Sequence, residues 1–186
     1  MNKLYFAIKS ICRPLVLSGV LCVLWSSSSS ALPFNITYPI IGPSHFSDDY
    51  YSARSGGIHA ATDVFANKMQ EIVSPVDGVI TYVAWPQPSY GYMVSIRDSQ
   101  NYRYNFIHIN NDTPGTDDGN ARGTVIYAPD MKAGNPVVKG QHIAYVGDSG
   151  NAESTASHLH FEIIRPDGSI ENPYGSLVYG NHIGAP

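Results

Sequence analysis

Short runs of β-branched and aromatic residues, each ended by a turn, constrain the fold of this chain more than any other feature. The turns include Pro75-Val76-Asp77-Gly78 and Gly147-Asp148-Ser149-Gly150, in which Gly can adopt positive φ without steric cost. No segment repeats apolar residues at helical spacing, and 17 Gly and 13 Pro in 186 residues are too many for a helical bundle. The chain is therefore predicted to be mainly β, and the clearest predicted strands span residues 79–84, 92–97, 102–109 and 158–165.

Length and charge limit the classes of protein that remain. Of the 186 residues 43% are hydrophobic, which is enough for the core of one domain, and we expect a monomer. Eleven basic and fifteen acidic residues give a net charge of −4, and no cluster of Lys or Arg follows residue 13. A protein that binds duplex nucleic acid needs a positive face that displaces counterions. The sequence therefore excludes a nucleic acid partner.

The N-terminal segment is organised like an export signal. Lys3, Lys9 and Arg13 precede an apolar run over residues 14–25, which is followed by a Ser-rich segment and Ala31. A basic segment, a short apolar run and small residues before the cleavage position are typical of a secretory signal peptide. The apolar run is shorter than the roughly 20 residues that a membrane-spanning helix needs. A buried helix is the less favoured alternative.

The predicted cleavage defines the mature protein. We expect residues 1–31 to be the signal peptide and residues 32–186 to be a single domain, exported to the periplasm or the extracellular space without a transmembrane segment. Both cysteines, Cys12 and Cys22, lie in the signal, so the mature chain has no disulfide and no thiol ligand. A lipoprotein signal at Cys22 is disfavoured because the preceding Leu21 is large.

The segment 158–162, His-Leu-His-Phe-Glu, places two imidazoles on one surface. Side chains alternate along a strand, so His158, His160 and Glu162 share one face and the apolar residues between them share the other. With seven histidines in the chain, chance alone produces roughly 0.26 such pairs. The pattern by itself therefore leaves an ordinary structural strand as an alternative to a metal site.

A second segment supplies a carboxylate near a histidine. His59 and Asp63 are four residues apart, at a bend that leads into a predicted strand, and can converge on one ion. Taken alone, they are as well explained by a solvated histidine and a turn-capping aspartate. With His160 they form a set of two imidazoles and one carboxylate, which suits one catalytic Zn²⁺ because the fourth tetrahedral position stays open to water. Such a water has its pKa lowered to about 7.

Two further histidines are candidates for proton transfer. His158 adjoins the predicted ligand His160, and His108 closes a predicted strand in which alternation places Tyr104 and Phe106 on its own face. Amide hydrolysis needs a proton acceptor for the attacking water and a donor to the oxyanion, and histidine suits either role. The sequence does not distinguish the role of His108 from that of His158.

Together these motifs resemble the lysostaphin-type (LytM-like) zinc metallopeptidases, which cut peptide bonds in bacterial peptidoglycan. The resemblance covers nearly all of the predicted mature chain. It is carried by the segments 57–63, 74–80, 140–150 and 158–162 and by His108, which falls where the family has a histidine after an aromatic strand.

The resemblance implies a fold and a site. The fold is an antiparallel sheet that floors a groove with loop walls, of the duplicated hybrid motif type. The implied ligands of a single Zn²⁺ are His59, Asp63 and His160, and His108 and His158 are the implied catalytic residues. The implied activity is that of a zinc endopeptidase acting on the peptide stems or cross-links of peptidoglycan.

Two details and two alternatives accompany this prediction. The segment 110–134 is expected to form an unusually long groove wall. Ala61 stands where the family usually has Gly, and a positive φ there costs about 1 kcal/mol.

One alternative is a non-catalytic cell-wall-binding module that activates another hydrolase as its regulatory partner. The other is an unrelated zinc amidase that removes the peptide stem from the sugar. Because some family members lose ligands and become non-catalytic, the presence of all five polar site residues here favours an enzyme.

Overall fold

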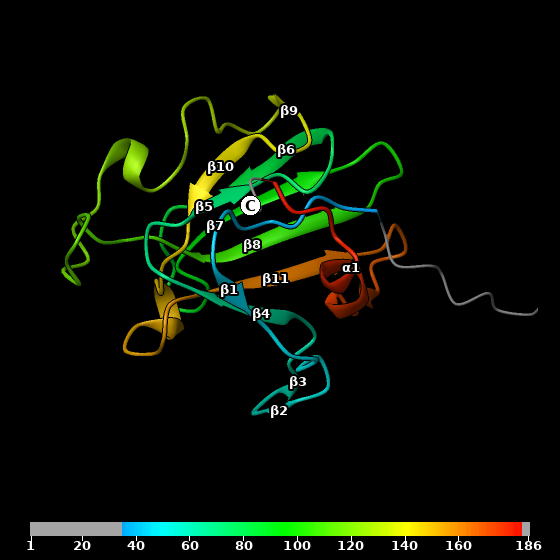
Figure 1. The fold of residues 1–186 in the computed structure, drawn as a ribbon, viewed down its shortest axis with the longest axis horizontal. Coiled ribbons are helices and arrows are strands. Elements are labelled where there is room, and N and C mark those ends of the chain that lie inside the picture. Colours follow the sequence, from blue (N-terminus) through cyan, green and yellow to red (C-terminus); the bar gives the residue numbers. More distant parts are fainter. Residues whose placement is uncertain (1–34, 184–186) are drawn as a thin grey trace, which may run out of the picture. The chain divides into compact units, whose positions relative to one another are not determined.

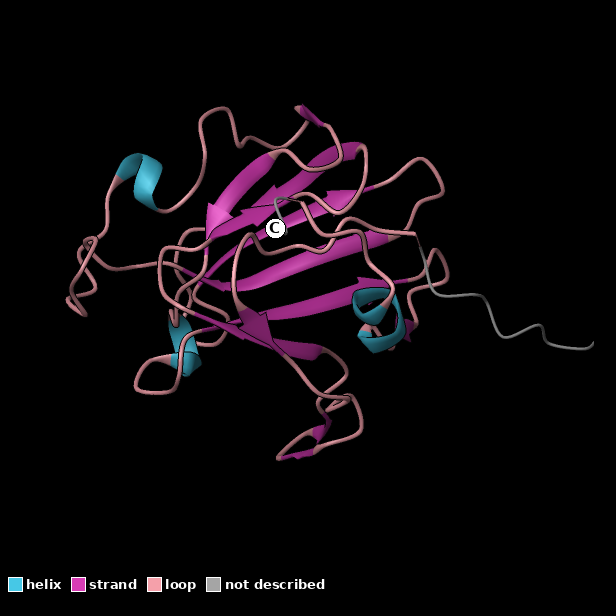
Figure 2. Cartoon of the chain, in the orientation of Figure 1, coloured by secondary structure: helices cyan, strands magenta, loops and turns pink. Residues whose placement is uncertain are grey.

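A large antiparallel sheet forms the centre of the fold (Figure 1 and Figure 2). The computed structural model describes residues 35–183, so the predicted signal peptide lies outside the described residues. All strand pairs of the large sheet are antiparallel. The order of its strands is β1 (Ser44–His45), β4 (Thr62–Ala66), β11 (His158–Ile164), β8 (Arg103–Ile109), β7 (Tyr92–Arg97), β6 (Gly78–Val83) and β9 (Pro136–Val137), with β12 (Ile170–Glu171) paired to β11.

Smaller elements surround this sheet. Two further pairs of strands are β5 (Glu71–Val73) with β10 (His142–Tyr145), and β2 (Ala53–Arg54) with β3 (Gly57–Ile58). Within residues 35–183 the helical elements are α1 (Tyr174–Val178) and the 3₁₀ turns Gly123–Val125 and Gly150–Ala152. None of the helices in these residues has the length and apolar character needed to cross a bilayer. The prediction of a mainly β antiparallel fold is confirmed.

The strand boundaries follow the sequence pattern closely, whereas the helix does not. The predicted strand over residues 92–97 coincides with β7. The predicted strands over 102–109 and 158–165 differ from β8 and β11 by one residue at one end, and the strand over 79–84 is shifted from β6 by one residue at both ends. No helical pattern in the sequence anticipated α1. Its first N–H donates to the side-chain oxygen of Asn172, and Leu177 is fully buried. Five residues are too few to show a helical period in the sequence.

The core lies on one face of the large sheet, and this leaves the other face as the floor of a groove. In β11 alternate residues are fully buried in the core, namely Leu159, Phe161 and Ile163. The residues between them line the groove, namely His158, His160 and Glu162. Ile72 of β5 and Ile143 of β10 belong to the same apolar cluster. Each fully buried large apolar side chain stabilises the fold by about 1.5–3 kcal/mol, so the core fixes which face β11 presents to the groove.

Lys68 anchors the long segment that was expected to form a groove wall. Its Nζ lies 2.6 Å from Asp112, 2.6 Å from Asp117 and 2.8 Å from Asp148. The side chains of Asp112 and Asp148 are almost fully buried, and their carboxylates raise the pKa of Lys68 against the opposing effect of its partial burial. The ammonium group thereby ties the segment 110–134 to the turn that follows β10.

We expect the Lys68→Ala variant to lower the free energy of unfolding. Two buried carboxylates, Asp112 and Asp148, then lose their shared cation. Because the Lys68 side chain is itself 25% exposed, the expected loss is about 2 kcal/mol, less than for a fully buried pair. Urea titration measures it, with the exposed Lys132→Ala on the same segment as the control. Equal stability of the two variants would contradict the anchoring role.

Candidate metal centre

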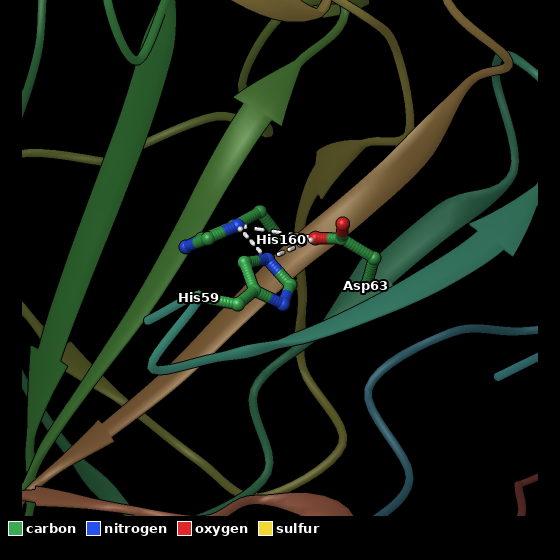
Figure 3. Close-up of side chains that lie close together, drawn as sticks. All are labelled: His59, Asp63 and His160. Carbon is green, nitrogen blue, oxygen red and sulfur yellow. Dashed lines mark hydrogen bonds and ion pairs between the residues drawn. The ribbon is translucent and has the colours of Figure 1, made fainter. Parts of the chain in front are cut away.

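Three side chains from separate parts of the chain point at one another in the groove (Figure 3). His59 precedes β4, Asp63 lies on β4 and His160 lies on β11, where it is paired in register with Asp63. His59 Nε2 lies 3.1 Å from Asp63 Oδ1 and 3.1 Å from His160 Nδ1, and His160 Nδ1 lies 3.1 Å from Asp63 Oδ1. The three atoms therefore form a nearly equilateral triangle.

This triangle has the dimensions of a metal site. With bonds of about 2.0–2.1 Å, neighbouring ligand atoms of a tetrahedral zinc ion are about 3.3 Å apart. An imidazole nitrogen carries either a proton or a lone pair, so at most two of the three contacts can be hydrogen bonds. One cation, in contrast, attracts all three atoms at once. The donor set of His59, Asp63 and His160 fits a zinc ion.

Each imidazole of the triangle has a carboxylate beside its other nitrogen, and at His160 the contact is a hydrogen bond. His59 Nδ1 lies 3.3 Å from Asp49 Oδ2, and His160 Nε2 lies 3.3 Å from Glu162 Oε1. The Asn105 side-chain amide donates a hydrogen bond of 2.7 Å to the other oxygen of Glu162. Carboxylates placed in this way fix the ring orientation and the tautomer of metal-binding histidines.

The electrostatics of the triangle favour a positive charge at its centre. Burial by itself raises the pKa of Asp63, but hydrogen bonds from His160 and His59 outweigh it and hold that pKa far below its usual range. Burial lowers the pKa of His160, yet Asp63 and Glu162 outweigh it and raise the pKa to about 9. Each shift reflects the attraction between carboxylate and imidazole: the histidines stabilise the charged form of Asp63, and Asp63 and Glu162 stabilise the protonated form of His160.

His108 and His158 lie beside the triangle with the same tautomer. His108 Nδ1 donates to the carbonyl oxygen of Ser149 at 2.8 Å, and His158 Nδ1 donates to that of Ala156 at 2.7 Å. A carbonyl only accepts, so the Nε2 atom of each neutral ring carries a lone pair. The two ring centroids are 5.1 Å apart, and both rings line the groove. Burial lowers the pKa of His108 to about 4, so this ring is neutral at pH 7.

His108 reaches the groove only because the strand is irregular. Met93 pairs with Ile107 and Tyr92 with Ile109, so His108 is an extra residue in β8, with φ at 63°. The prediction that His108 shares the face of the preceding aromatic residues is wrong, because Phe106 is buried in the core while His108 lines the groove. A bulge re-aims a side chain in this way, and positive φ in a residue other than Gly is typical of functional sites.

In the segment 57–63 a residue other than Gly has an unusual backbone angle, and it lies one residue before Ala61, the position considered from the sequence. Among the residues of this segment other than Gly, positive φ belongs to Ala60, at 58°, and not to Ala61. Ala61 is instead fully buried in ordinary backbone geometry. The strain that was considered for Ala61 therefore does not arise there.

The groove around these residues has a volume of about 670 Å³. Its walls are contributed by the β2–β3 hairpin, by residues 89–90 and by the loop before β11, including Asn151, Ala152 and Thr155. The segment 110–134 contributes none of the lining residues, so the expectation that it walls this groove is wrong. Its apolar residues, including Ile126 and Met131, pack into the core instead.

Three residues of the site were not anticipated from the sequence. Asp49 and Asn105 orient the triangle from outside, and Arg54 lies 3.3 Å from Asp63 Oδ2. Asp49 lies in a loop and Arg54 in the β2–β3 hairpin, both before His59 in the sequence. Neither position has a periodic pattern that predicts where its side chain points. Asn105 faces Glu162 across the β8–β11 pair, and a polar residue in the middle of an apolar strand is the signal that marks it.

An antiparallel sheet that floors an open groove, with a donor set for one metal ion and two neighbouring histidines, is an arrangement typical of metal-dependent hydrolases. The chain belongs to peptidase family M23, whose sequence profile matches residues 57–173. The resemblance to LytM-like peptidases is thereby confirmed.

Three known proteins illustrate the similarity. The L-Ala–D-Glu endopeptidase of Bacillus subtilis (strain 168) is 31% identical over 128 residues, which are 64% of this chain and 34% of that protein. The catalytic domain of lysostaphin from Staphylococcus simulans is 22% identical with a TM-score of 0.54, over 72% of this chain and 90% of that domain. A zinc-containing peptidase from Vibrio cholerae is 20% identical with a TM-score of 0.54, over 76% of this chain and 40% of that one. At these identities the two structures show a shared fold.

Proposed function

We propose that this protein is a zinc endopeptidase that hydrolyses amide bonds in the peptide stems or cross-links of peptidoglycan. The observation that carries the proposal is the 3.1 Å triangle of His59, Asp63 and His160 beside two groove-lining histidines. Membership of peptidase family M23 and the similarity to the Bacillus subtilis endopeptidase support a peptide substrate.

In this proposal His59, Asp63 and His160 hold one Zn²⁺. When bound, the ion supplies a Lewis acid for the scissile carbonyl and lowers the pKa of a bound water to about 7. Glu162 keeps His160 in the tautomer that leaves a lone pair toward the ion, and Asp49 lies 3.3 Å from His59 Nδ1, where its charge favours the same tautomer of His59.

In this proposal His108 and His158, the two groove-lining histidines outside the ligand triangle, transfer protons. His108 and His158 both present an Nε2 lone pair because their Nδ1 protons are held by backbone carbonyls. Either ring can accept the proton of the attacking water, and a ring that has accepted it can donate to the oxyanion or to the leaving amine. The groove thus contains both an acceptor and a second imidazole for the developing charge.

We further propose that residues 1–31 direct export and are removed, leaving residues 32–186 as a monomeric domain in the periplasm or outside the cell. Families of this kind act on a substrate that lies outside the cytoplasmic membrane, which supports export. Mass spectrometry of the secreted product is expected to find an N-terminus at Leu32. An intact N-terminus at Met1 would contradict the signal peptide.

The activity is tested by digesting purified cell walls. We expect one zinc ion per chain, and we expect soluble peptides whose sugar–peptide linkages remain intact. Release of whole stems from the sugar would identify an amidase instead. Retention of zinc without peptide release from any type of wall would favour the alternative of a non-catalytic module that activates another hydrolase.

We expect Glu162→Gln to weaken zinc binding by about 10- to 100-fold, because an amide replaces the carboxylate that faces His160 Nε2. Competition with a chromophoric chelator measures the affinity. Glu71→Gln, on exposed β5 surface, is the matched control and is expected to bind zinc as the wild type does. An unchanged affinity in Glu162→Gln would contradict the orienting role of this carboxylate.

A further inference from the structure

Arg54 is the only Lys or Arg among the described residues that line the groove. It ends β2, in the hairpin that projects beyond the β4 side of the large sheet (Figure 1). Its side chain is 52% exposed, and its Nη2 lies 3.3 Å from Asp63 Oδ2. A guanidinium group has five N–H donors, so this contact leaves most of the group available to a ligand in the groove.

Asp63 determines how close Arg54 stands to the candidate metal centre. Oδ1 of this carboxylate belongs to the ligand triangle, while Oδ2 faces the guanidinium. The Asp63 carboxylate therefore lies between the guanidinium group of Arg54 and the proposed metal, beside which the scissile bond is to be bound. The hairpin residues around it are exposed, so nothing in the described part of the chain covers this side of the groove.

The charges of the groove make Arg54 the natural partner of an anion. The acidic side chains of the lining are Asp63 and Glu162, and both face His160. Apart from the histidines and the proposed zinc ion, a substrate carboxylate in the groove would thus meet one cationic side chain, the partly exposed Arg54. Arg matches a carboxylate geometrically, because two parallel N–H groups can donate to its two oxygens.

We propose that Arg54 binds a carboxylate of the substrate peptide next to the scissile bond, and so makes the site selective for acidic peptide stems over neutral ones. This inference rests on the proposed function and names its substrate class. The competing explanation is that Arg54 only orients Asp63. In that case its removal affects acidic and neutral substrates equally.

The test uses two synthetic stem peptides that differ in one group. One carries a glutamate with a free carboxylate next to the scissile bond, and in the other this carboxylate is amidated. We expect the wild type to show a kcat/KM about 10- to 100-fold higher for the free acid, mainly through KM, since one charge-assisted bidentate contact is lost on amidation. In Arg54→Ala the ratio is expected to fall close to 1.

Two further variants and a metal assay sharpen the test. Arg54→Lys keeps the charge without the bidentate geometry and is expected to give an intermediate ratio. Arg97→Ala, exposed at the end of β7 and absent from the groove lining, is expected to keep the wild-type ratio. Zinc content and thermal unfolding are measured for every variant, so that an effect on Asp63 or on folding is recognised.

The outcomes separate this inference from the proposed function. If the wild type cleaves both peptides equally, or if Arg54→Ala keeps the wild-type ratio, the enzyme stands and the role of Arg54 is overturned. If the wild type cleaves neither peptide and releases nothing from cell walls, the proposed function fails and the inference fails with it. If the ratio of kcat/KM between the acidic and the amidated peptide falls in Arg54→Ala while the zinc content is unchanged, both the proposed function and the role of Arg54 are supported.

Discussion

Replacing His160 with alanine is expected to remove both zinc binding and peptide release. His160 Nδ1 is one corner of the 3.1 Å triangle, and without it His59 and Asp63 retain only two donor atoms for the ion. A two-ligand site cannot hold zinc in the way a three-ligand catalytic site does. We expect the zinc affinity to fall by more than about 100-fold, which is a larger loss than that expected for Glu162→Gln, where the ligand itself is kept. Elemental analysis of the purified protein and a cell-wall digestion measure the two losses.

The fold is expected to survive this substitution. The neighbours that carry the core, Leu159 and Phe161, point away from the groove and are unaffected. His142→Ala is the matched control, because this histidine bonds a backbone carbonyl on β10 and is absent from the groove lining. Stoichiometric zinc in His160→Ala, at wild-type circular dichroism, would show that the ligand set has been assigned incorrectly.

The second large effect, a loss of kcat, is expected from replacing His108 or His158, the two groove-lining histidines outside the ligand triangle. His108→Ala and His158→Ala should each keep zinc but lower kcat by about 10²- to 10⁴-fold, the contribution typical of a positioned acid or base. Neither ring belongs to the triangle, and His158 Nε2 lies 3.8 Å from Asp63 Oδ1. Steady-state hydrolysis of a released muropeptide, together with zinc content, distinguishes lost proton transfer from lost metal.

A matched substitution outside the groove controls for the change of residue type. His45 stacks on Phe65 at the edge of the sheet and is absent from the groove lining, so His45→Ala is expected to keep its activity. Wild-type kcat in His108→Ala or in His158→Ala would remove that residue from the proposed chemistry. Loss of zinc in either variant would assign it to the metal centre instead.

Much of this arrangement could be predicted because it depends on local periodicity. The alternation in residues 158–162 predicts that His158 and His160 face away from Phe161, and the structure confirms this division of the strand. The spacing of His59 and Asp63 predicted that they can share an ion, and their ligand atoms lie 3.1 Å apart. In both cases the relevant geometry is contained in a few consecutive residues.

The errors concern residues whose direction depends on partners far away in the sequence. Alternation gave the wrong face for His108, because the extra residue in β8 appears only when β7 is paired beside it. The segment 110–134 was expected in the groove, but Lys68 and the core hold it elsewhere. Asp49 and Arg54 had no pattern to mark them, since a loop and a two-stranded hairpin have no fixed period.

The sequence alone therefore determined the strands, the buried face of β11 and the residue types of the candidate site, because the two-residue period of a strand and the chemistry of side chains are local properties. Only the tertiary structure decided that His59 and His160, 101 residues apart, meet at 3.1 Å, and that His108 and Arg54 turn into the same groove. The physical reason is that strand register, bulges and loop anchoring arise from pairing and packing between distant segments, which determine positions that no local pattern contains.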